Sequence, residues 1–358
     1  MFLFCHRTGI PPSASGLQRW PVAGHTRRGC WIMPLPVQAM TRLTIFDAGP
    51  YTTLQDAGRT GHQALGLPEG GAMDEDARIC GNWLVGNPAD AAGLETYMGG
   101  LRFTTDGPLT LALTGTPGDS LQVTRADGHI QEIAAGCSIH LSGGECVFLP
   151  PMRHSNLAFI ALSGALDLPN VYGSLSTSLN ARLGGLEGRR LASQDSVKIK
   201  IPHSPPPGRK LDRVQAFFAP AEAVRVVLGP QDYAFSAAEI DKLLATQWTL
   251  SAKMDRMGIR LNGPSIQHKN SADILSDGIV KGAVQVPGDG QPIIMMADHQ
   301  TTGGYTKIAC VISADLGKLA RVHPHKKIRF QAVTQSQAEE LAQQHKTELT
   351  SLMRQDIS

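Results

Sequence analysis

The stretch that decides the fold class is GAVQVPGDGQPIIMMADHQTTGGYTKIACVI, residues 282–312. It contains three short apolar runs, AVQV, PIIMM and KIACVI, which are separated by Gly, Asp and Pro residues. Apolar runs of this length between turn-forming residues are typical of β-strands joined by short connections. The stretch therefore predicts three strands.

The rest of the chain repeats this pattern. Its 358 residues include 38 Gly and 23 Pro, and only 18% are charged. Strand-like runs separated by the same turn-forming residues occur between residues 93 and 192 and again after residue 223. Because this composition suits many short strands better than a helical bundle, we expect a mainly β protein.

The charge balance excludes some classes of partner. With 33 Lys and Arg residues against 31 Asp and Glu residues, the formal net charge is +2. A chain so near neutrality has no long-range field that would attract nucleic acid or an anionic membrane surface. No apolar run approaches the ~18 residues of a membrane-spanning helix, so we expect neither nucleic-acid binding nor membrane insertion.

The six cysteines indicate the cellular compartment. They are scattered along the chain and contain no CxxC pair. This usage favours a reducing, cytoplasmic location over a disulfide framework.

Three helices are predicted by capping residues and apolar periodicity. Asp74 is the expected N-cap of the first helix, which ends at Gly86-Asn87-Pro88. Ser236, followed by Glu239 three residues later, predicts a capping box at the start of the second helix. Residues 336–353 carry apolar residues at helical spacing and predict a closing helix.

The chain divides into three predicted parts. Residues 1–39 show no helical or strand periodicity, so we expect them to be disordered or untranslated, with translation starting at Met40. Residues 40–204 form the expected N-terminal β-rich domain, and residues 205–358 form the C-terminal domain with its closing helix. The boundary rests on three successive prolines at 205–207, which cannot join a central strand.

Polar residues concentrate in the stretch that decides the fold. Gln285, Asp298, Gln300, Thr301 and Thr302 lie beside two glycines between predicted strands. A carboxylate, amides and hydroxyls at a strand end could hold a small amide or a phosphate-bearing substrate. The alternative is a hairpin turn whose polar residues cap backbone groups.

Further candidates lie in other connections. Asp255 and Arg256 are adjacent at a strand edge, where neighbouring side chains point to opposite faces, so only one of the two should face a site. Lys281 could neutralise an anion or be a solvated lysine at a strand start, and Gln231 could be a turn residue only. Two long Gly-rich connections, residues 49–74 and 172–191, could line a cleft. The first of them contains Gln55, Asp56 and Arg59.

Several catalytic motifs are absent from the sequence. It contains no GxxxxGK[ST] phosphate loop, no GxGxxG followed by an acidic residue and no GxSxG elbow. His323 and His325 form an isolated HxH without a third ligand nearby in the sequence, so no metal site is expected.

Several motifs in order along the chain carry a family resemblance. They are GPYTTLQDAGRTGHQALGLPEGGAMD, VVLGPQDYAF, KMDRMGIRLNG, GAVQVPGDGQPIIMMADHQTTGGYTKIA and ADLGKLARVHP. Together they resemble the biotin-dependent carboxyltransferase-like family, also called the allophanate hydrolase subunit 2 family. The resemblance covers residues 43–333.

This resemblance implies a cyclophilin-like β-barrel in the C-terminal half and a related α+β domain before it. It also implies partners, because family members act with a homologous B-type companion and, in 5-oxoprolinase, with an A-type subunit. That assembly uses ATP to cleave 5-oxo-L-proline to L-glutamate. We therefore expect the remaining, C-type subunit of such an enzyme. The alternatives are a urea amidolyase or allophanate-hydrolase type carboxyltransferase that uses biotin, and a kinase-inhibitor-associated regulatory protein.

Site roles follow from this expected chemistry. ATP would phosphorylate the lactam oxygen, and Lys281, Arg256 or Arg59 could stabilise the resulting anionic charge. Asp298 or Asp255 could orient water or the ring nitrogen. Gln55, Asp56, Arg59, Gln231, Gln285, Gln300, Thr301 and Thr302 are the expected substrate-binding residues, and no metal is expected.

Four positions depart from the family pattern. Leu175 stands where an Arg is usual after Gly-Ser, Asn180 and His299 stand where Arg is usual, and Asp277 replaces a Glu. The first three changes remove cationic side chains from the expected cleft, which leaves room for an altered substrate or a weakly active paralogue.

Overall fold

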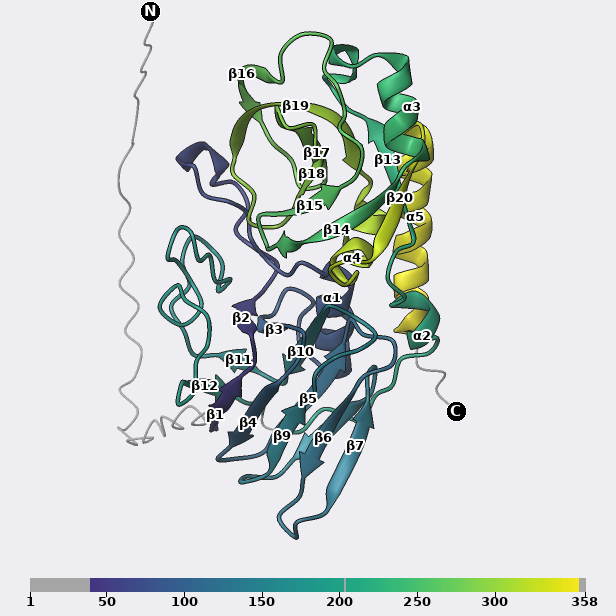
Figure 1. Cartoon of the computed structure of the whole chain (residues 1–358). Helices are drawn as coiled ribbons and strands as arrows, with labels where there is room; N and C mark the ends of the chain where they lie inside the picture. Colours follow the sequence, from purple (N-terminus) through teal and green to yellow (C-terminus); the bar gives the residue numbers. More distant parts are fainter. Residues whose placement is uncertain (1–38, 203, 354–358) are drawn as a thin grey trace, which may run out of the picture. The chain divides into compact units, whose positions relative to one another are not determined.

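Strands dominate the computed structural model, which describes residues 39–202 and 204–353 (Figure 1). Residues 1–38 of the predicted extension lie outside the described residues. Gln38–Ser358 form one compact unit, within which the strands fall into two groups. The domain boundary after residue 204 therefore stays a prediction.

The first group of strands forms two sheets. A seven-stranded sheet has the order β11-β12-β1-β4-β9-β6-β7, and a five-stranded sheet has the order β2-β3-β10-β5-β8. Their bounds are β1 (Met40–Ala48), β2 (Tyr51–Gln55), β3 (Gly93–Tyr97), β4 (Leu101–Thr105), β5 (Leu109–Thr114), β6 (Ser120–Thr124), β7 (Ile130–Ala134), β8 (Ser138–Leu141), β9 (Cys146–Leu149), β10 (Leu157–Leu162), β11 (Ala165–Leu166) and β12 (Ser196–Lys200).

The five-stranded sheet is covered on both faces. Along β5 and β10, alternate side chains point to opposite faces. Leu111 and Ile160 join the core shared with the seven-stranded sheet, whereas Ala112 and Phe159 pack with the helices on the other side. Every residue of both strands is therefore buried.

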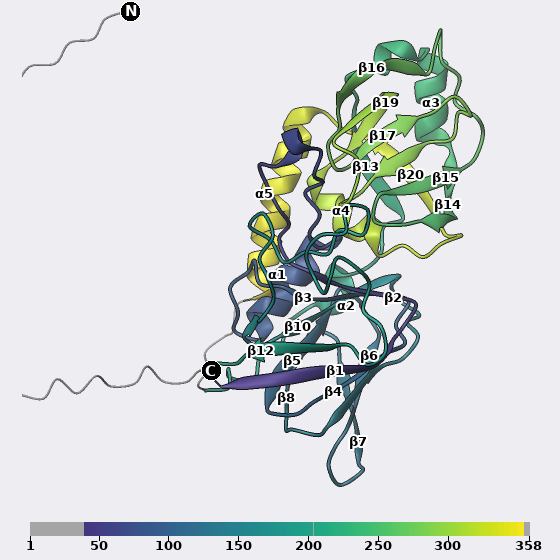
Figure 2. The same cartoon turned by 90° about the vertical axis from the view of Figure 1, so that its left-hand side faces the viewer.

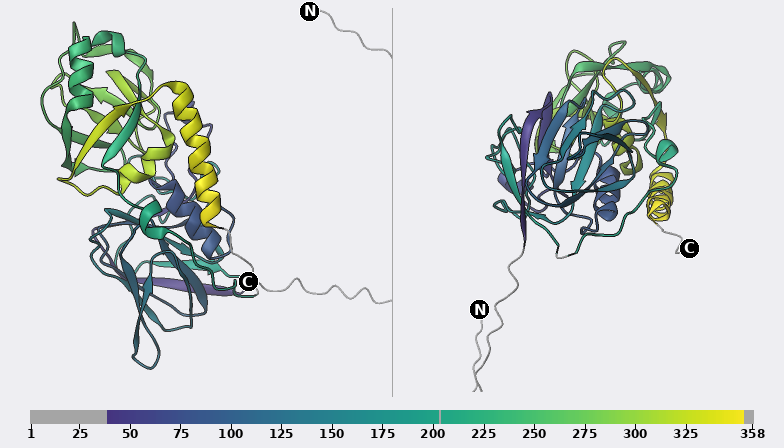
Figure 3. Two further views of the ribbon diagram at one scale, coloured as in Figure 1. Left: turned by 90° about the vertical axis from the view of Figure 1, so that its right-hand side faces the viewer. Right: turned by 90° about the horizontal axis from the view of Figure 1, so that it is seen from below.

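Two helices cover that second face. In α1 (Glu75–Leu84) the predicted N-cap is confirmed, because Asp74 Oδ1 accepts from the Ala77 backbone N–H at 3.2 Å. The predicted closing helix is also confirmed as α5 (Gln335–Leu352), which has a capping box. Leu349 and Leu352 of α5 are buried in the same cluster as α1, and Figure 3 shows the two helices alongside each other.

The second group of strands closes into a barrel. Its eight-stranded sheet has the order β13-β20-β14-β15-β18-β17-β19-β16, and an additional β13–β19 pairing closes the ring without β16 (Figure 2). The strands are β13 (Ala223–Leu228), β14 (Gln247–Met254), β15 (Gly258–Asn262), β16 (Asp273–Gly278), β17 (Ala283–Val286), β18 (Ile293–Met295), β19 (Thr302–Val311) and β20 (Lys327–Ala332). This is the expected cyclophilin-like barrel, preceded by the expected α+β part.

The remaining helices are short. They are η1 (Gln63–Leu65), α2 (Val214–Phe217), η2 (Asp232–Ala234), α3 (Ala237–Ala245) and α4 (Ser313–Ala320). Ser236 caps α3 as predicted, but the prediction that Glu239 completes a capping box is wrong. The Glu239 carboxylate binds Lys242 Nζ and the Gln267 backbone N–H instead of the backbone N–H of its own N-cap.

Candidate functional site

A buried ion cluster joins the two groups of strands. Arg256 lies in the turn between β14 and β15, and its Nε and Nη2 donate to the two carboxylate oxygens of Asp298 at 2.9 and 2.8 Å. Its Nη1 donates to Glu95 Oε1 at 2.5 Å, and its Nη2 also donates to the Gly71 carbonyl at 2.7 Å. Arg256, Asp298 and Glu95 are 2%, 5% and 1% exposed, so the cluster is shielded from water.

Backbone pairing sets the positions of these side chains. The Asp298 N–H donates to the Arg256 carbonyl at 2.8 Å, so the two turns of the barrel are bonded directly. On the other side, Glu95 lies on β3, and its Oε2 accepts from the Met73 N–H at 2.6 Å. Gln55 ends the neighbouring strand β2 and accepts from Arg256 Nη2 at 3.3 Å. Side chains from four separate segments of the chain, and backbone groups from a fifth, therefore contribute to one cluster.

Burial and the neighbouring charges have opposite effects on the pKa values of Glu95 and Arg256. Burial raises the pKa of Glu95, and the Arg256 guanidinium offsets this only in part. Burial alone would lower the pKa of Arg256, but the carboxylates of Asp298 and Glu95 raise it well above its usual value. Arg256 therefore remains a cation that holds both carboxylates in place.

Arg59 lies beside this cluster with donors to spare. It is 1% exposed, and its Nη2 donates to the Ser176 carbonyl. Its Nε and Nη1 have no hydrogen-bond partner within residues 39–202 and 204–353. A Cβ built on Gly70 would lie 3.3 Å from Arg59 Nη1 and 3.6 Å from Asp298 Oδ1, so Gly70 leaves a small gap between these groups.

Burial and the neighbouring carboxylates have opposite effects on the pKa of Arg59. Burial lowers its pKa, whereas the charges of Asp56 and Asp298 act in the opposite direction. An unpaired buried donor costs free energy comparable to a lost hydrogen bond. An anionic ligand at the Gly70 gap would therefore give Arg59 Nη1 an acceptor and stabilise the guanidinium.

Asp56 positions the polar connection that covers Arg59. Its Oδ1 accepts from the Ser174 and Ser176 hydroxyls at 2.7 and 2.5 Å, and its Oδ2 accepts from the Leu175 N–H at 2.5 Å. The connection of residues 172–191 thus lies against β2, where Gln55 Nε2 donates to the Thr177 carbonyl at 3.0 Å. Asp56 is consequently a positioning residue.

Residues that sequence reasoning missed complete the site. The Tyr51 and Tyr97 rings pack edge to face at 5.1 Å, and the Arg190 guanidinium lies 4.1 Å from the Tyr51 ring centre. Burial raises the pKa of Tyr51 to about 12, although the positive charge of Arg256 acts in the opposite direction. Glu95 was also missed, and its burial on β3 becomes visible only in the structure.

Lys281 stands apart from the hydrogen bonds of the cluster. It precedes β17, and burial lowers its pKa while the charges of Glu75 and Glu95 raise it. Its side chain forms no ion pair within the part of the chain that the structure describes. Its predicted role on an anion stays a prediction.

Three other predicted residues line a separate hollow of about 260 Å³ on the barrel. Asp255, Gln285 and Gln300 contribute to it together with Met257, Met295 and other neighbours. Gln285 is 1% exposed, and its Nε2 has no partner in the described residues. These three residues therefore line a hollow that is separate from the Arg256 cluster, although Asp255 is next to Arg256 in the sequence.

Of the adjacent residues Asp255 and Arg256, only one side chain faces the cluster, as expected. Arg256 is buried in it, whereas Asp255 is exposed and accepts from the Met257 and Gly258 N–H groups at 2.8 and 3.1 Å. Asp255 thus closes a turn.

The last predicted residues lie along β19. Gln231 Oε1 accepts from the Lys307 N–H at 3.2 Å, Thr301 is half-buried, and Thr302 is exposed at the start of the strand. None of these three side chains bonds to Arg256 in the described part of the chain. Their substrate-binding roles stay predictions.

Three of the departures from the family pattern have local roles. The Leu175 backbone binds Asp56, and His299 Nδ1 donates to the Gln300 carbonyl at 2.7 Å. Asp277 pairs with Lys307 Nζ at 2.9 Å, a bond that lowers the pKa of this carboxyl.

Two questions concern the described residues, namely whether their side chains could hold a metal ion and whether any of their helices could span a membrane. Within them no group of three or more His, Cys, Asp or Glu side chains could hold a metal ion. Among their helices, none is long and apolar enough to cross a membrane.

The fold and the cluster define a carboxyltransferase-like β protein. The family model described as "Carboxyltransferase domain, subdomain A and B" matches residues 65–332. The chain belongs to this family.

Two curated relatives carry a more particular name, the C-type subunit of 5-oxoprolinase. The one from Escherichia coli (strain K12) is 37% identical over 290 residues, which cover 80% of this chain and 90% of that protein. The one from Haemophilus influenzae is 32% identical over 315 residues, covering 87% of this chain and 98% of that protein. The similarity therefore extends over nearly the whole length of both relatives.

Solved structures agree on the fold. TTHA0988 is 28% identical with a TM-score of 0.72, and the match covers 82% of this chain and 56% of that one. The Kluyveromyces lactis urea amidolyase is 23% identical with a TM-score of 0.77, and the match covers 88% of this chain and 20% of that one. This chain thus spans about half of the first protein and a fifth of the second.

Proposed function

We propose that this chain is the C-type subunit of an ATP-dependent 5-oxoprolinase, which cleaves 5-oxo-L-proline to L-glutamate together with A-type and B-type subunits. Its near full-length similarity to the C-type 5-oxoprolinase subunits of two bacteria supports this assignment. The free Cys80, Cys137, Cys146 and Cys310 are consistent with the cytoplasm as its location.

The geometric observation that carries the proposal is the pair of open donors on Arg59. The substrate has a carboxylate beside its lactam ring, and a hydrogen bond from a guanidinium N–H to a carboxylate is roughly twice as strong as one between neutral groups. Arg59 Nε and Nη1 are buried and unpartnered within the described residues, and Asp298 Oδ1 lies across the gap at Gly70. Arg59 would hold the carboxylate, and Asp298 would orient the ring nitrogen or a water.

The remaining chemistry requires activation of the amide. An unactivated lactam is a poor electrophile, so ATP transfers its γ-phosphoryl group to the lactam oxygen and ADP leaves. One water then adds to the activated carbon as the ring C–N bond breaks, and a second water displaces phosphate. Within this chain, Arg256 fixes Asp298, and nearby cationic groups stabilise the developing negative charge.

A biotin-dependent carboxyltransferase is the second candidate. The family description and the fold of the urea amidolyase favour it. In that case the protein would accept a carboxyl group from biotin on another chain, and ATP would be consumed elsewhere.

Reconstitution separates the two candidates. Glutamate and ADP are measured after mixing this chain with the A-type and B-type proteins of the same organism, with each protein omitted in turn. We expect turnover only when all three are present and without biotin. Full turnover without this chain would refute the assignment, and turnover that depends on a biotinylated carrier would favour the second candidate.

A further inference from the structure

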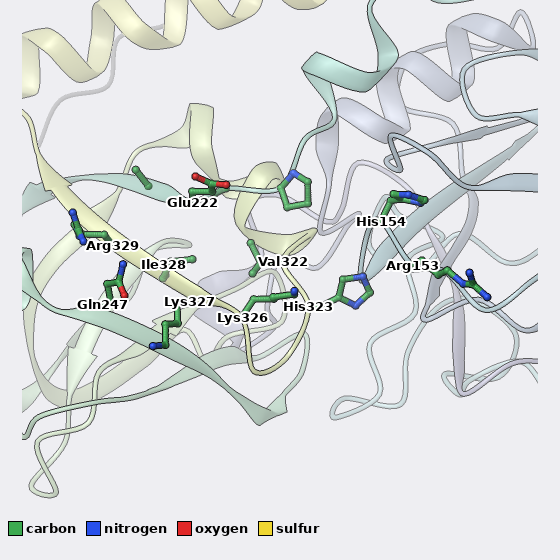
Figure 4. A pocket seen from close by; sticks show the side chains of 13 residues that line it. Arg153, His154, Glu222, Gln247, Val322, His323, Lys326, Lys327, Ile328 and Arg329 are labelled. Carbon is green, nitrogen blue, oxygen red and sulfur yellow. The ribbon is translucent and has the colours of Figure 1, made fainter.

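A second hollow, of about 620 Å³, lies away from the Arg256 cluster (Figure 4). Arg153 and His154, from the connection between β9 and β10, line one side of it. The segments around β13 and β20 and the start of β14 line the rest, with residues 220–223, 247, 322–323 and 326–329. Its volume lies in the range of small-molecule sites, roughly 300–1,000 Å³.

The backbone around this hollow is well paired. β20 runs between β13 and β14, which sets Arg329 opposite both Ala223 and Gln247. The Arg329 N–H also donates to the Glu222 carbonyl at 3.0 Å. On the far side, the Asn156 N–H donates to the Arg321 carbonyl at 2.8 Å, which ties the Arg153 connection to the barrel.

The hollow has a strong positive charge. Four cationic side chains line it, and none forms an ion pair within residues 39–202 and 204–353: Arg153, Lys326, Lys327 and Arg329. The one carboxylate in the lining is that of Glu222. Four positive charges and one negative charge give +3 locally, more than the net +2 of the whole chain. This charge is therefore concentrated in one place.

His323 is one of the residues that line this hollow. Its ring is bonded to the Arg153 backbone, and burial lowers its pKa. Its Nε2 is buried and has no hydrogen-bond partner among the described residues. His154 is different, because its Nδ1 lies 3.2 Å from Asp119 Oδ1.

We propose that this hollow binds a small molecule through a polyphosphate group. Guanidinium groups bind phosphate oxygens in pairs, and lysine ammonium groups add point charges. A polyphosphate carries enough negative charge to match the excess of +3, and the hollow is large enough for one small ligand. The two possible sources of this group are a nucleoside triphosphate and an inorganic polyphosphate.

Titration calorimetry at low ionic strength tests the proposal on the isolated chain, so its outcome is independent of oxoprolinase activity. The ligands are inorganic tripolyphosphate, ATP and adenosine. The variant Lys327→Ala/Arg329→Ala removes two exposed cations of the hollow, and Lys198→Ala/Lys346→Ala removes two exposed cations elsewhere. Since all four residues are exposed, both variants should fold.

We expect tripolyphosphate and ATP to bind, adenosine not to bind, and the hollow variant to weaken binding at least tenfold while the control changes it less than twofold. Binding of ATP at least tenfold tighter than tripolyphosphate would support the proposal with a nucleotide as the source, and the reverse would support an inorganic source. Absence of tripolyphosphate and ATP binding, equal binding of adenosine, or equal weakening in both variants would overturn it.

Discussion

Arg256 compensates two buried carboxylates, those of Asp298 and Glu95. Removing one partner of a buried ion pair leaves an uncompensated charge and costs about 3–5 kcal/mol. We therefore expect Arg256→Met to lower the free energy of unfolding by about that amount in urea denaturation.

The matched control is Arg42→Ala, which removes an exposed arginine from β1. It should change the unfolding free energy by less than about 0.5 kcal/mol. Equal effects of the two variants would mean that the Arg256 cluster adds nothing to stability.

At the residue scale, sequence reasoning found the polar members of the site but not their grouping. Gln55, Arg59, Arg256 and Asp298 were all predicted from their residue types, and the structure brings them together. Glu95 was missed because a charged residue in a strand usually faces water, and only long-range pairing of β3 places it against Arg256.

The connection of residues 172–191 depends on an ion pair at its end. Arg189 Nη1 and Nη2 donate to the two Asp195 oxygens at 2.6 and 2.8 Å, and the Ala192 N–H donates at 2.7 Å. These bonds lower the pKa of Asp195, with the Arg189 bond as the largest cause. The folded carboxylate is therefore favoured, and its stabilisation is present above the ordinary pKa of 3.8 and lost as the pH falls through the lower folded value.

Asp195→Asn should consequently destabilise the protein by about 1 kcal/mol at pH 7, and the difference from the unmodified protein should shrink as the pH falls below 3.8 and through the lower folded pKa of Asp195. Urea midpoints of both proteins across this range provide the measurement. A difference that persists unchanged at the acidic end would contradict the role of the carboxylate charge.

Helix α5 is anchored by the apolar residues of its last turns. Leu352 is 1% exposed and packs in the cluster that contains α1. Leu352→Ala should lower the unfolding free energy by about 2–5 kcal/mol, measured by urea denaturation. Glu348→Ala, on the exposed part of the helix, is the control and should have little effect. Similar results for both would show that α5 is not packed as described.

Among the secondary-structure elements, turn-forming Gly, Asp and Pro residues between apolar runs predicted most strands, and capping residues predicted the helices with clear N-caps. The run LETYMGGLRF, residues 94–103, looks like one strand-like segment but belongs to two strands, β3 and β4, because Met98, Gly99 and Gly100 adopt positive φ angles and turn the chain. β16 was missed because its residues are mostly exposed and show no apolar alternation. Exposed strands are stabilised by pairing alone, which a single sequence does not reveal.

For the whole molecule, the family resemblance predicted the barrel, whereas composition predicted only a mainly β fold. Closure of the ring requires β13 to pair with β19, more than 70 residues later. No local pattern encodes this pairing. The same holds for the site, whose members lie on both groups of strands.

In the proposed function, Arg59 holds the substrate carboxylate. The reconstituted three-subunit enzyme is assayed with 5-oxo-L-proline and with 2-pyrrolidinone, the same lactam without a carboxylate, using unmodified protein and Arg59→Met. Because a hydrogen bond to a charged group contributes about 1.5–3 kcal/mol, we expect the variant to lose roughly tenfold or more in kcat/KM for 5-oxo-L-proline and nothing for 2-pyrrolidinone. An equal loss for both lactams, or no loss for either, would contradict the claim.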